Sequence, residues 1–569
     1  MDVRKKTHKF KCTFSGSVAD AMRRRGWVEV EENKEDWDIF WCDMTELRIL
    51  FQNGKLLEDH QRIGHFRNCQ ELSRKNQLVK NLKKLRHKLE RYLGRHEADK
   101  LDFIPTTYIL PSEHKNFVLE FRNNPNLLWI IKPAAGSQGR GIFIFQKIKD
   151  YLEWRQKLEF PNSDFHGHHP PPPTATFTSQ SPDGLLSTSM GSSSTTDPLA
   201  DLYNKNLMDK STSTIPGDPG FIPDDTSSQG DPSIGASSDI STTANLEPDT
   251  LARNPIRSDA FVVQRYISNP YLIGGRKFDI RFYVLVTSFQ PLKAWVYREG
   301  FARFSAGQFS LDALQDVYIH LTNVAIQKTS EDYNPEKGSK WSLRSLREYL
   351  TARHGKEKIQ KMMNQIDYIV IRTLQSAANL VVQDRHCFEI YGFDVILDSN
   401  LFPWLLEVNA CPAFTPSNEE DYVLKCGLID DTTSVLDLEG RLTGYEKRIG
   451  GYDLIWNDGP VYANSNDCGY SLGIEDGPKL NSFLGCVNDR VQQLRDLYRN
   501  ATFLRAAQKM MNSGAGYQMD GYDDPPAGTG FHSPPRAKKG PDPRFRLPES
   551  CPIIKSSPKS DAVENSIVF

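Results

Sequence analysis

Two carboxylates and one amide in the second half of the chain have the types and spacing to hold a divalent cation. Asp394 lies in one apolar run, while Glu407 and Asn409 lie in the next, across a turn at Asp398. Alternate residues of a strand share a face, so Glu407 and Asn409 point the same way and Asp394 can lie opposite them. Oxygen ligands that leave room for phosphate suit Mg²⁺. A structural pairing of the acids with Lys or Arg is the alternative.

A glycine-rich segment that starts at Lys132 could bind phosphate. Its sequence, KPAAGSQGRG, holds three glycines within six positions, which lets backbone N–H groups approach a ligand closely. Lys132 adds a positive charge. The segment is not a Walker A loop, because the GK[ST] order is absent and a strand follows it. A simple turn is the alternative.

A third group of polar residues alternates along one apolar run. Lys277, Asp279 and Arg281 are separated by Phe278 and Ile280, so the three polar side chains share one face of a strand. Nucleotide sites combine carboxylates for hydroxyl groups with cations for phosphates, although an exposed sheet face has the same pattern. No GxSxG motif or linked Ser, His and Asp spacing is present, so a covalent enzyme intermediate is not expected.

Strands and helices that alternate along the chain must position these residues. The pattern predicts an α/β or α+β fold. Strands are predicted at 39–42, 127–132, 142–145, 261–266, 277–287, 292–298, 388–397 and 402–408. Helices are predicted at 73–96, 342–350 and 356–382, each with apolar residues three or four positions apart.

Composition divides the chain into five segments. Residues 1–100 form a basic N-terminal domain, 101–159 a central part and 258–500 the catalytic part. Residues 160–257 are rich in Ser, Thr, Pro, Gly and Asp and are predicted to be a disordered insert, and 501–569 a disordered tail. Between Pro161 and Arg257 there are twelve acidic and four basic residues, so this stretch carries −8 and the rest +6 of a total of −2. A basic folded part favours acidic partners.

The predicted helix at 73–96 is strongly basic. It carries nine Lys or Arg residues against one Glu, around a stripe of leucines. A solvated face and a surface for a polyanion both fit this pattern.

The nine cysteines show no zinc-ligand spacing, which predicts free thiols in a reducing compartment. The N-terminus lacks the apolar run of a signal peptide, and no stretch reaches about 18 apolar residues. We therefore expect an intracellular protein without membrane insertion, and no nucleic acid as partner.

Taken together, six motifs resemble the tubulin–tyrosine-ligase-like family in their order and context. They are KPAAGSQGRGI at 132–142, QRYI at 264–267, KFDIR at 277–281, LTN at 321–323, FDVILD at 393–398 and LLEVNACPAF at 405–414. The resemblance implies an ATP-grasp fold with an N-terminal pre-ATP-grasp domain. The long insert and the Cys411 of EVNACP depart from the family pattern.

The resemblance also implies a reaction: an ATP-dependent tubulin polyglutamylase, which adds glutamate to glutamate side chains of tubulin tails through an acyl-phosphate intermediate. It implies ATP and two Mg²⁺ ions as cofactors. The metal ligands would be Asp394, Glu407 and Asn409, and the catalytic residues Arg281 and Glu407. Free glutamate would be bound by Arg303, Lys340 and Lys425. The implied ATP-binding residues are Lys75, Lys132, Gln138, Gly139, Arg140, Gly141, Gln264, Arg265, Tyr266, Ile267, Lys277, Phe278, Asp279, Thr322 and Asn323.

The partners implied are tubulin or microtubules and free glutamate, with accessory subunits as a possible addition. The implied location is the cytoplasm and cytoskeleton, including the axoneme or basal body of a cilium or flagellum. Three alternatives stay open. A glycylase or tyrosine ligase of the same family is disfavoured by Arg303 and Lys425, and a weakly active microtubule-binding subunit is disfavoured by the intact Lys132, Asp394, Glu407 and Asn409. An ATP-grasp enzyme of small-molecule metabolism fits the chemistry but not the basic first region.

Overall fold

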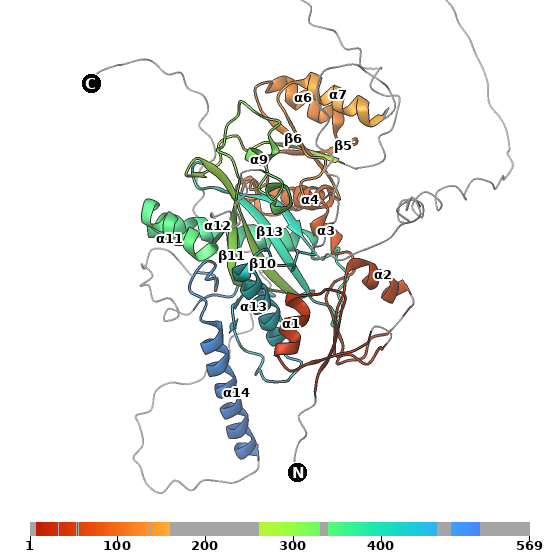
Figure 1. Ribbon diagram of the computed structural model, residues 1–569, viewed down its shortest axis with the longest axis vertical. Coiled ribbons are helices and arrows are strands. Elements are labelled where there is room, and N and C mark those ends of the chain that lie inside the picture. The colour runs from red at the N-terminus through yellow and green to blue at the C-terminus, as the bar shows by residue number, and fades with distance from the viewer. Residues whose placement is uncertain are drawn as a thin grey trace, which may run out of the picture. The chain divides into compact units, whose positions relative to one another are not determined.

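Three β-sheets and the helices that flank them make up the described part of the computed structural model (Figure 1). It describes residues 7–31, 34–52, 54, 56–136, 138–159, 261–330, 340–463 and 479–512. All of these belong to one unit, formed by residues 1–161 and 254–569. The insert predicted at 160–257 lies outside the described residues.

The N-terminal sheet is parallel and has the strand order β2-β1-β3-β4. Its strands are β1 (Lys9–Cys12), β2 (Val28–Glu29), β3 (Ile39–Trp41) and β4 (Arg62–Ile63). Its helices are α1 (Ser17–Arg24) and α2 (Met44–Gln52), followed by α3 (Gln70–Ser73), α4 (Lys75–Leu93) and α5 (Arg95–Asp99).

A second, antiparallel sheet has the order β5-β8-β6-β7. It consists of β5 (Thr107–Leu110), β6 (Trp129–Pro133), β7 (Phe143–Phe145) and β8 (Phe261–Arg265), with helices α6 (His114–Asn123) and α7 (Ile148–Glu159). Because β8 lies between β5 and β6, the chain re-enters the same sheet after residue 260.

The largest sheet is antiparallel and contains the order β14-β13-β10-β11-β16-β15, with β9 paired to β10 and β12 paired to β11. Its strands are β9 (Leu272–Ile273), β10 (Arg276–Phe289), β11 (Leu292–Phe304), β12 (Lys340–Ser342), β13 (Glu389–Leu397), β14 (Pro403–Asn409), β15 (Arg448–Ile449) and β16 (Tyr452–Asn457). The associated helices are α9 (Val317–His320), α10 (Val324–Gln327), α11 (Leu343–His354), α12 (Lys356–Ala377), α13 (Glu419–Leu436) and α14 (Arg490–Asn512).

The N-terminal region does not have a core separate from that of the large sheet. Trp37 and Leu82 share one cluster of buried residues with Phe282 and Phe393. The Ile63 N–H also donates to the His386 carbonyl oxygen at 2.8 Å, which joins β4 to the start of β13. Residues 1–100 therefore form part of the catalytic unit, and the expected boundary at residue 100 separates no independent core.

The basic helix predicted at 73–96 is the helix α4. Its leucine stripe faces the core, with Leu78, Leu82, Leu85 and Leu89 all buried. Gly94 ends the helix with a φ of 88°, in the left-handed region that glycine favours. Most of its Lys and Arg side chains remain at the surface, as the sequence indicated.

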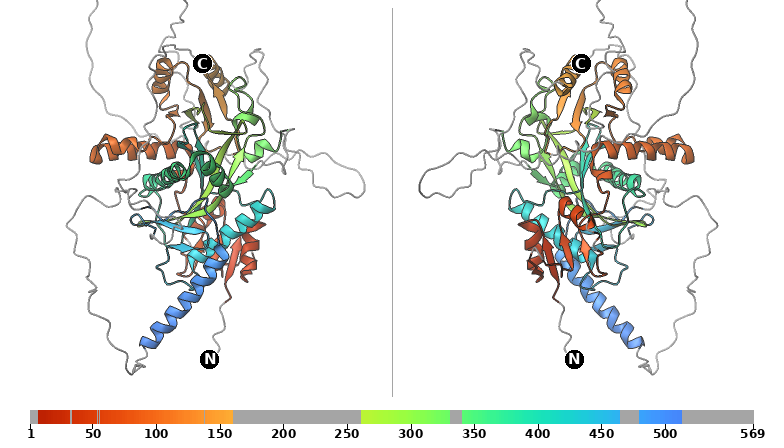
Figure 2. Two further views of the ribbon diagram at one scale, coloured as in Figure 1. Left: turned by 90° about the vertical axis from the view of Figure 1, so that its left-hand side faces the viewer. Right: turned by 90° about the vertical axis from the view of Figure 1, so that its right-hand side faces the viewer.

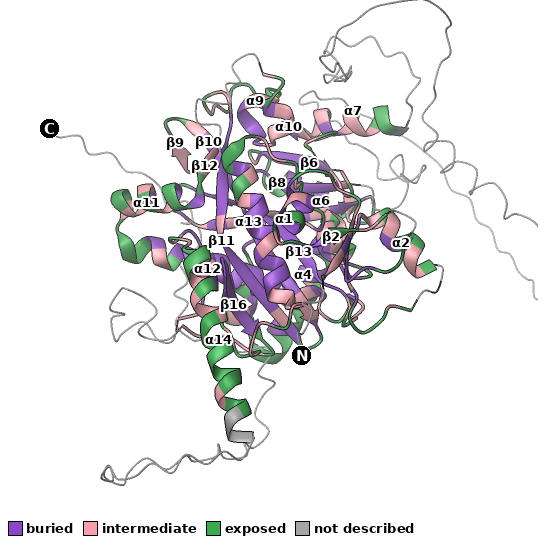
Figure 3. Cartoon of the chain, turned by 60° about the horizontal axis from the view of Figure 1, so that its bottom comes forward, coloured by how far each residue is buried: buried purple, intermediate pink, exposed green. Residues whose placement is uncertain are grey.

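Two predicted boundaries are corrected. The strand predicted at 292–298 continues to Phe304, because β10 pairs with β11 along its length, up to Phe278 opposite Phe304. The tail expected from 501 begins no earlier than 513, because α14 continues through Asn512 and buries Leu494 and Ala501 on one face. The rest of α14 is largely exposed and extends away from the sheets (Figures 2 and 3). Among the described residues, no helix combines the length and apolar character needed to cross a membrane.

Gly300 gives a test of the close approach between β10 and β11. A Cβ atom there would lie 2.4 Å from the Arg281 carbonyl oxygen and 3.2 Å from the Phe282 Cα atom, both backbone atoms. We expect Gly300→Ala to lower the free energy of unfolding by about 1–3 kcal/mol, as overpacking does, in guanidinium denaturation.

Gly459 is the matched control, because a Cβ atom there would meet nothing within 4 Å. We expect Gly459→Ala to change stability by less than about 0.5 kcal/mol. Equal stability of both variants would contradict the packing described for β10 and β11.

Candidate active site

A cavity lies between the small antiparallel sheet and the large one. Its volume is about 860 Å³, including the part open to solvent. Strands β6 and β8 contribute one wall, and β10, β13 and β14 the other. The lining residues are Lys75, Pro105, Ile130, Lys132, Pro133, Gly136, Gln138, Gly139, Arg140, Ile142, Gln264, Arg265, Tyr266, Ile267, Lys277, Asp279, Arg303, His320, Leu321, Thr322, Asn323, Asp394, Ile396, Leu406 and Glu407.

The candidate metal ligands meet at one end of the β13–β14 hairpin. Asp394 and Glu407 are direct partners in the register of the two strands. The amide nitrogen of Asn409 lies 3.4 Å from Asp394 Oδ2 and 3.4 Å from Glu407 Oε1. The hairpin therefore brings together the three side chains that the sequence placed on one face.

Two arginines hold Asp394. Arg281, its partner in the β10–β13 register, binds both carboxylate oxygens, at 2.7 Å to Oδ2. Arg303 on β11 lies 2.9 Å from the same Oδ2 and binds Asp279 through Nε at 2.8 Å. Burial alone would raise the pKa of Asp394, but the charges of Arg281 and Arg303 hold it well below its usual range. The group stays ionised in the interior.

Two buried lysines face the cavity. Lys132 Nζ donates to Gln264 Oε1 at 2.8 Å, and Lys277 Nζ donates to the Tyr266 hydroxyl at 2.9 Å. Burial lowers the pKa of Lys132 to about 8, with Glu407 opposing the shift. Burial lowers the pKa of Lys277 to about 7, with Asp279 opposing it. The nearby carboxylates therefore offset only part of the effect of burial on the two lysines. An anionic ligand would favour their charged forms.

Lys75 reaches the cavity from the N-terminal region. It is the first residue of α4, and its backbone N–H donates to the Ala134 carbonyl oxygen at 3.0 Å. Its Nζ lies 3.0 Å from the Gly136 carbonyl oxygen and 3.0 Å from Glu407 Oε2. The basic helix thus begins at the glycine-rich loop and adds a positive charge beside the acidic hairpin.

The glycine-rich loop adopts a backbone that requires its glycines. Gln138, Gly139 and Gly141 have φ values of 60°, 76° and 69°. A Cβ atom at Gly139 would also lie 2.3 Å from the Ile326 Cδ1 atom. The loop is therefore closely packed against α10, and the side chains of Gln138 and Arg140, hydrogen-bonded at 2.9 Å, line the cavity.

A second group of cations adjoins the cavity. Lys340 is the direct partner of Arg303 in the β11–β12 register. Lys340 Nζ lies 3.2 Å from Asp421 Oδ2, and Lys425 Nζ lies 3.0 Å from the same atom. Burial lowers the pKa of both lysines, while Asp421 raises it. Two cations thus share the Asp421 carboxylate, and Arg303, whose side chain binds Asp279 and Asp394, lies opposite Lys340 in the strand register.

Six of the expected site residues do not line the cavity. The side chain of Phe278 points to the opposite face of β10 and packs in the core, with its ring 5.2 Å from that of Phe304. Strand alternation forces this orientation, because Lys277 and Asp279 face the cavity. Arg281 and Asn409 act through their contacts with Asp394, and Gly141, Lys340 and Lys425 lie beside the lining.

The sequence pattern missed the apolar walls and one histidine. Ile130, Ile142 and Leu321 line the cavity. Ile142 and Leu321 belong to two of the motifs, but an apolar residue in a strand or loop carries no signal that distinguishes a cavity wall from the core. His320 Nδ1 lies 2.9 Å from the Tyr266 hydroxyl, and its carbonyl oxygen accepts from Lys277 Nζ at 2.8 Å. Only the position of His320 before the LTN segment at 321–323 could have indicated it.

Comparison with known proteins agrees with this geometry. The model of the tubulin-tyrosine ligase family matches residues 54–169 and 225–440. The chain belongs to the tubulin-tyrosine ligase family. The described sheets and helices agree with the ATP-grasp-like fold of this family, as the motif order predicted.

Several relatives share most of their length with this member of the family. The probable tubulin polyglutamylase TTLL9 of Rattus norvegicus is 43% identical over 502 residues, which cover 86% of this chain and 92% of the relative. The probable tubulin polyglutamylase ttll-9 of Caenorhabditis elegans is 38% identical, over 80% and 87%. The probable alpha-tubulin polyglutamylase Ttll1 of Tetrahymena thermophila is 33% identical, over 79% and 93%. The segment KRIGGYDLIWNDGP at 447–460 by itself predicts a resemblance to the ninth member of the family, and the rat and nematode relatives confirm that resemblance.

The buried lysines predict a pH dependence of nucleotide binding. Between pH 7 and 9 the free protein loses the protons of Lys277 and Lys132, whose pKa values are about 7 and about 8. Bound phosphates favour the charged forms, so binding takes up protons and weakens as pH rises, by up to about tenfold per pH unit for each proton. Calorimetry with a non-hydrolysable ATP analogue, in buffers of different ionisation enthalpy, measures both quantities.

Lys277→Arg is the control for this prediction. A guanidinium does not lose its proton in this range, so the affinity of the variant should decline less steeply with pH. An affinity of the unaltered protein that stays constant from pH 7 to 9 would contradict the expected proton uptake.

Proposed function

We propose that this chain is an ATP-dependent ligase that adds glutamate to the glutamate side chains of tubulin tails. The observation that carries the proposal is the direct cross-strand pairing of Arg303 with Lys340. This pair joins the acidic hairpin of the cavity to the cations around Asp421. A nucleotide and an amino acid with two carboxylates could therefore be bound side by side.

The cavity suits ATP in its charge and in its lining. Its walls at Ile130, Ile142 and Leu321 are apolar enough for a base. Cations outnumber carboxylates in and next to the cavity. The cations are Lys75, Lys132, Arg140, Arg265, Lys277, Arg281 and Arg303, and the carboxylates are Asp279, Asp394 and Glu407.

The acidic hairpin fits Mg²⁺ by the chemistry of its donors. Asp394 and Glu407 offer carboxylate oxygens in a small space, which suits a hard cation that also binds phosphate. Asn409 points its amide nitrogen at both carboxylates here, so its amide group would have to turn over to present an oxygen. These three residues would hold the Mg²⁺ ions. The resemblance to the family implies two such ions. The bound metal would supply positive charge to the phosphate oxygens during transfer.

The side chains support a reaction in two steps. A carboxylate of the tubulin tail attacks the γ-phosphorus of ATP, and the bond from that phosphorus to the β-phosphate oxygen breaks. The products are an acyl phosphate on the tail and free ADP. Lys132 and Lys75 bind the phosphate oxygens, and Arg281 stabilises the acyl phosphate. The amine of free glutamate then attacks the acyl carbon, forms the amide bond and expels phosphate. No side-chain nucleophile is required.

Selection of glutamate would depend on the second group of cations. Glutamate brings two carboxylates, and Lys340 and Lys425 provide two cations against the single charge of Asp421, with Arg303 opposite Lys340 in the strand register. Glycine lacks the side-chain carboxylate and would leave part of this charge uncompensated. The same relatives carry the name tubulin polyglutamylase, which supports glutamate as the substrate.

The acidic tail of tubulin has a matching surface on α4. This helix begins at the cavity with Lys75 and exposes Lys80, Lys84 and Arg91 farther along. A chain of glutamates could follow the helix toward the acidic hairpin, guided by its charge. A substrate in microtubules would place the enzyme at the cytoskeleton, and we extend the proposal to the axoneme or basal body of a cilium or flagellum.

Glu407→Gln tests the metal site and the reaction together. The variant keeps the size of the side chain but removes one negative charge from the hairpin. We expect incorporation of radiolabelled glutamate into microtubules, with ATP and Mg²⁺, to fall at least about 100-fold, while the thermal unfolding midpoint stays within a few degrees. Preferential incorporation of glycine or tyrosine by the unaltered enzyme would refute the assignment of Arg303, Lys340 and Lys425.

Lys340→Met and Lys425→Met test the glutamate site. Each removes one charge-assisted hydrogen bond to a substrate carboxylate, which corresponds to roughly a 10–100-fold rise in KM for glutamate. The KM for ATP should change little. Lys361→Met, on the exposed side of α12, is the matched control and should leave both constants unchanged. An unchanged KM for glutamate in both site variants would remove them from the substrate site.

A further inference from the structure

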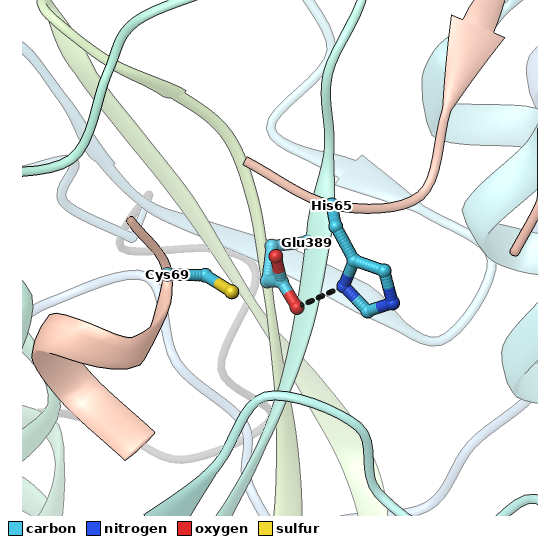
Figure 4. Close-up of side chains that lie close together, drawn as sticks. All are labelled: His65, Cys69 and Glu389. Atoms are coloured by element: carbon cyan, nitrogen blue, oxygen red, sulfur yellow. Dashed lines mark hydrogen bonds and ion pairs between the residues drawn. The ribbon is translucent and has the colours of Figure 1, made fainter. Parts of the chain in front are cut away.

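A group of thiols lies around a buried histidine and glutamate, outside the cavity. His65, Cys69 and Glu389 are all buried, and their potential ligand atoms lie within 4.8 Å of one another (Figure 4). Cys42 contributes its carbonyl oxygen to His65 at 3.1 Å, and Cys411 its sulfur at 3.2 Å. Of the seven cysteines described in the structure, all of them free, this group therefore holds three.

The imidazole of His65 is fixed at both nitrogen atoms. Nδ1 lies 2.6 Å from Glu389 Oε1, and the other oxygen of Glu389 accepts from the Phe66 N–H at 3.0 Å. Nε2 lies 3.1 Å from the Cys42 carbonyl oxygen, which can only accept, so Nε2 carries a proton. Burial lowers the pKa of His65, but Glu389 raises it well above the usual value. The single Nε2–H therefore lies between two acceptors, the Cys42 carbonyl oxygen and the Cys411 sulfur.

Cys411 is the member of the group that solvent reaches. Its side chain is exposed, whereas those of Cys42 and Cys69 are buried. His65 Nε2 lies 3.2 Å from its sulfur, and Glu389 orients His65 from the other side. An accessible sulfur, a histidine and a carboxylate thus lie in a row in space. This is the arrangement that activates nucleophilic cysteines.

The position of Cys411 connects it with the active site. It follows Asn409 by two residues, in the turn after β14. The next residue, Pro412, packs closely on Gly392, where a Cβ atom would lie 3.1 Å from Pro412 Cβ and 3.3 Å from Arg281 Cδ. A bulkier or charged group at Cys411 would therefore disturb both Asn409 and Arg281.

We propose that Cys411 is a modification site at which hydroperoxides switch off the active site. The sulfur attacks one peroxide oxygen, an S–O bond forms and the O–O bond breaks. The thiol proton passes to the departing oxygen, which leaves as water or an alcohol. Sulfur is oxidised by two electrons to a sulfenic acid, and the peroxide is reduced. The His65 N–H donates to the charge that develops at sulfur, as a donor does in other activated cysteine sites.

The same group is not arranged as a metal site. The distance of 2.6 Å between His65 Nδ1 and Glu389 Oε1 is that of a direct hydrogen bond. Two ligands on one ion, each about 2 Å from it, lie farther apart than this. The dashed contact in Figure 4 therefore occupies the two atoms that an ion would need.

The first test measures the modification itself and does not depend on the ligase reaction. The full chain is treated with a small excess of hydrogen peroxide, and sulfenic acid is trapped with a 1,3-dione and located by mass spectrometry. We expect trapping at Cys411 at least about tenfold faster than at Cys12 and Cys486, which are partly exposed. Equal rates at the three positions, or metal bound stoichiometrically to the His65 group, would overturn the proposal.

The second test rests on the proposed function and uses Cys411→Ser. We expect this variant to retain glutamate incorporation and to keep it after peroxide, whereas the matched variant Cys486→Ser loses it as the unaltered enzyme does. Affinity for a non-hydrolysable ATP analogue, measured in parallel, replaces incorporation if no ligase activity is found. Equal peroxide sensitivity of Cys411→Ser and the unaltered chain would refute a role for Cys411.

Discussion

A buried carboxylate between two guanidinium groups determines the arrangement of the active site. Asp394 is almost fully buried, yet Arg281 and Arg303 keep it ionised. Ionising a carboxylate in the interior is costly unless it is paired and hydrogen-bonded, so its two partners are held in fixed positions. Because Arg303 also binds Asp279, strands β10, β11 and β13 are tied together at one level of the sheet. Glu407 pairs with Asp394 and Lys340 pairs with Arg303 in the strand register, so the remaining charged groups are positioned from the same part of the sheet.

The pairing has a consequence for how ligands would bind. Arginines neutralise Asp394, and Lys75 Nζ lies 3.0 Å from Glu407 Oε2. A bound metal would take over part of this role and leave the cations available to phosphate and carboxylate groups. The two buried lysines differ from the arginines, because their amines can lose a proton near neutral pH. The arginines beside the β13–β14 hairpin thus stay charged at all physiological pH values, whereas the charge of Lys132 and Lys277 changes with pH.

The N-terminal region is part of the active site and of its surroundings. Lys75 reaches the glycine-rich loop from α4, and His65 reaches the start of β13 through Glu389. Both contacts join residues more than sixty positions apart in sequence, and both use side chains whose partners are buried or half-buried. The long separation explains why the sequence pattern alone described residues 1–100 as a separate basic domain.

Local patterns determined much of this protein. Alternating polarity fixed the face shared by Lys277, Asp279 and Arg281, since strand geometry leaves only two faces. Ordered motifs identified the family, and leucine spacing located α4. Only the tertiary structure decided which charges neutralise each other, because pairing depends on strand register: Arg281 opposite Asp394, and Arg303 opposite both Asp279 and Lys340. The contact of His65 with Cys411 likewise joins residues 346 positions apart. A pattern that repeats every two to four residues cannot reveal a contact over that separation.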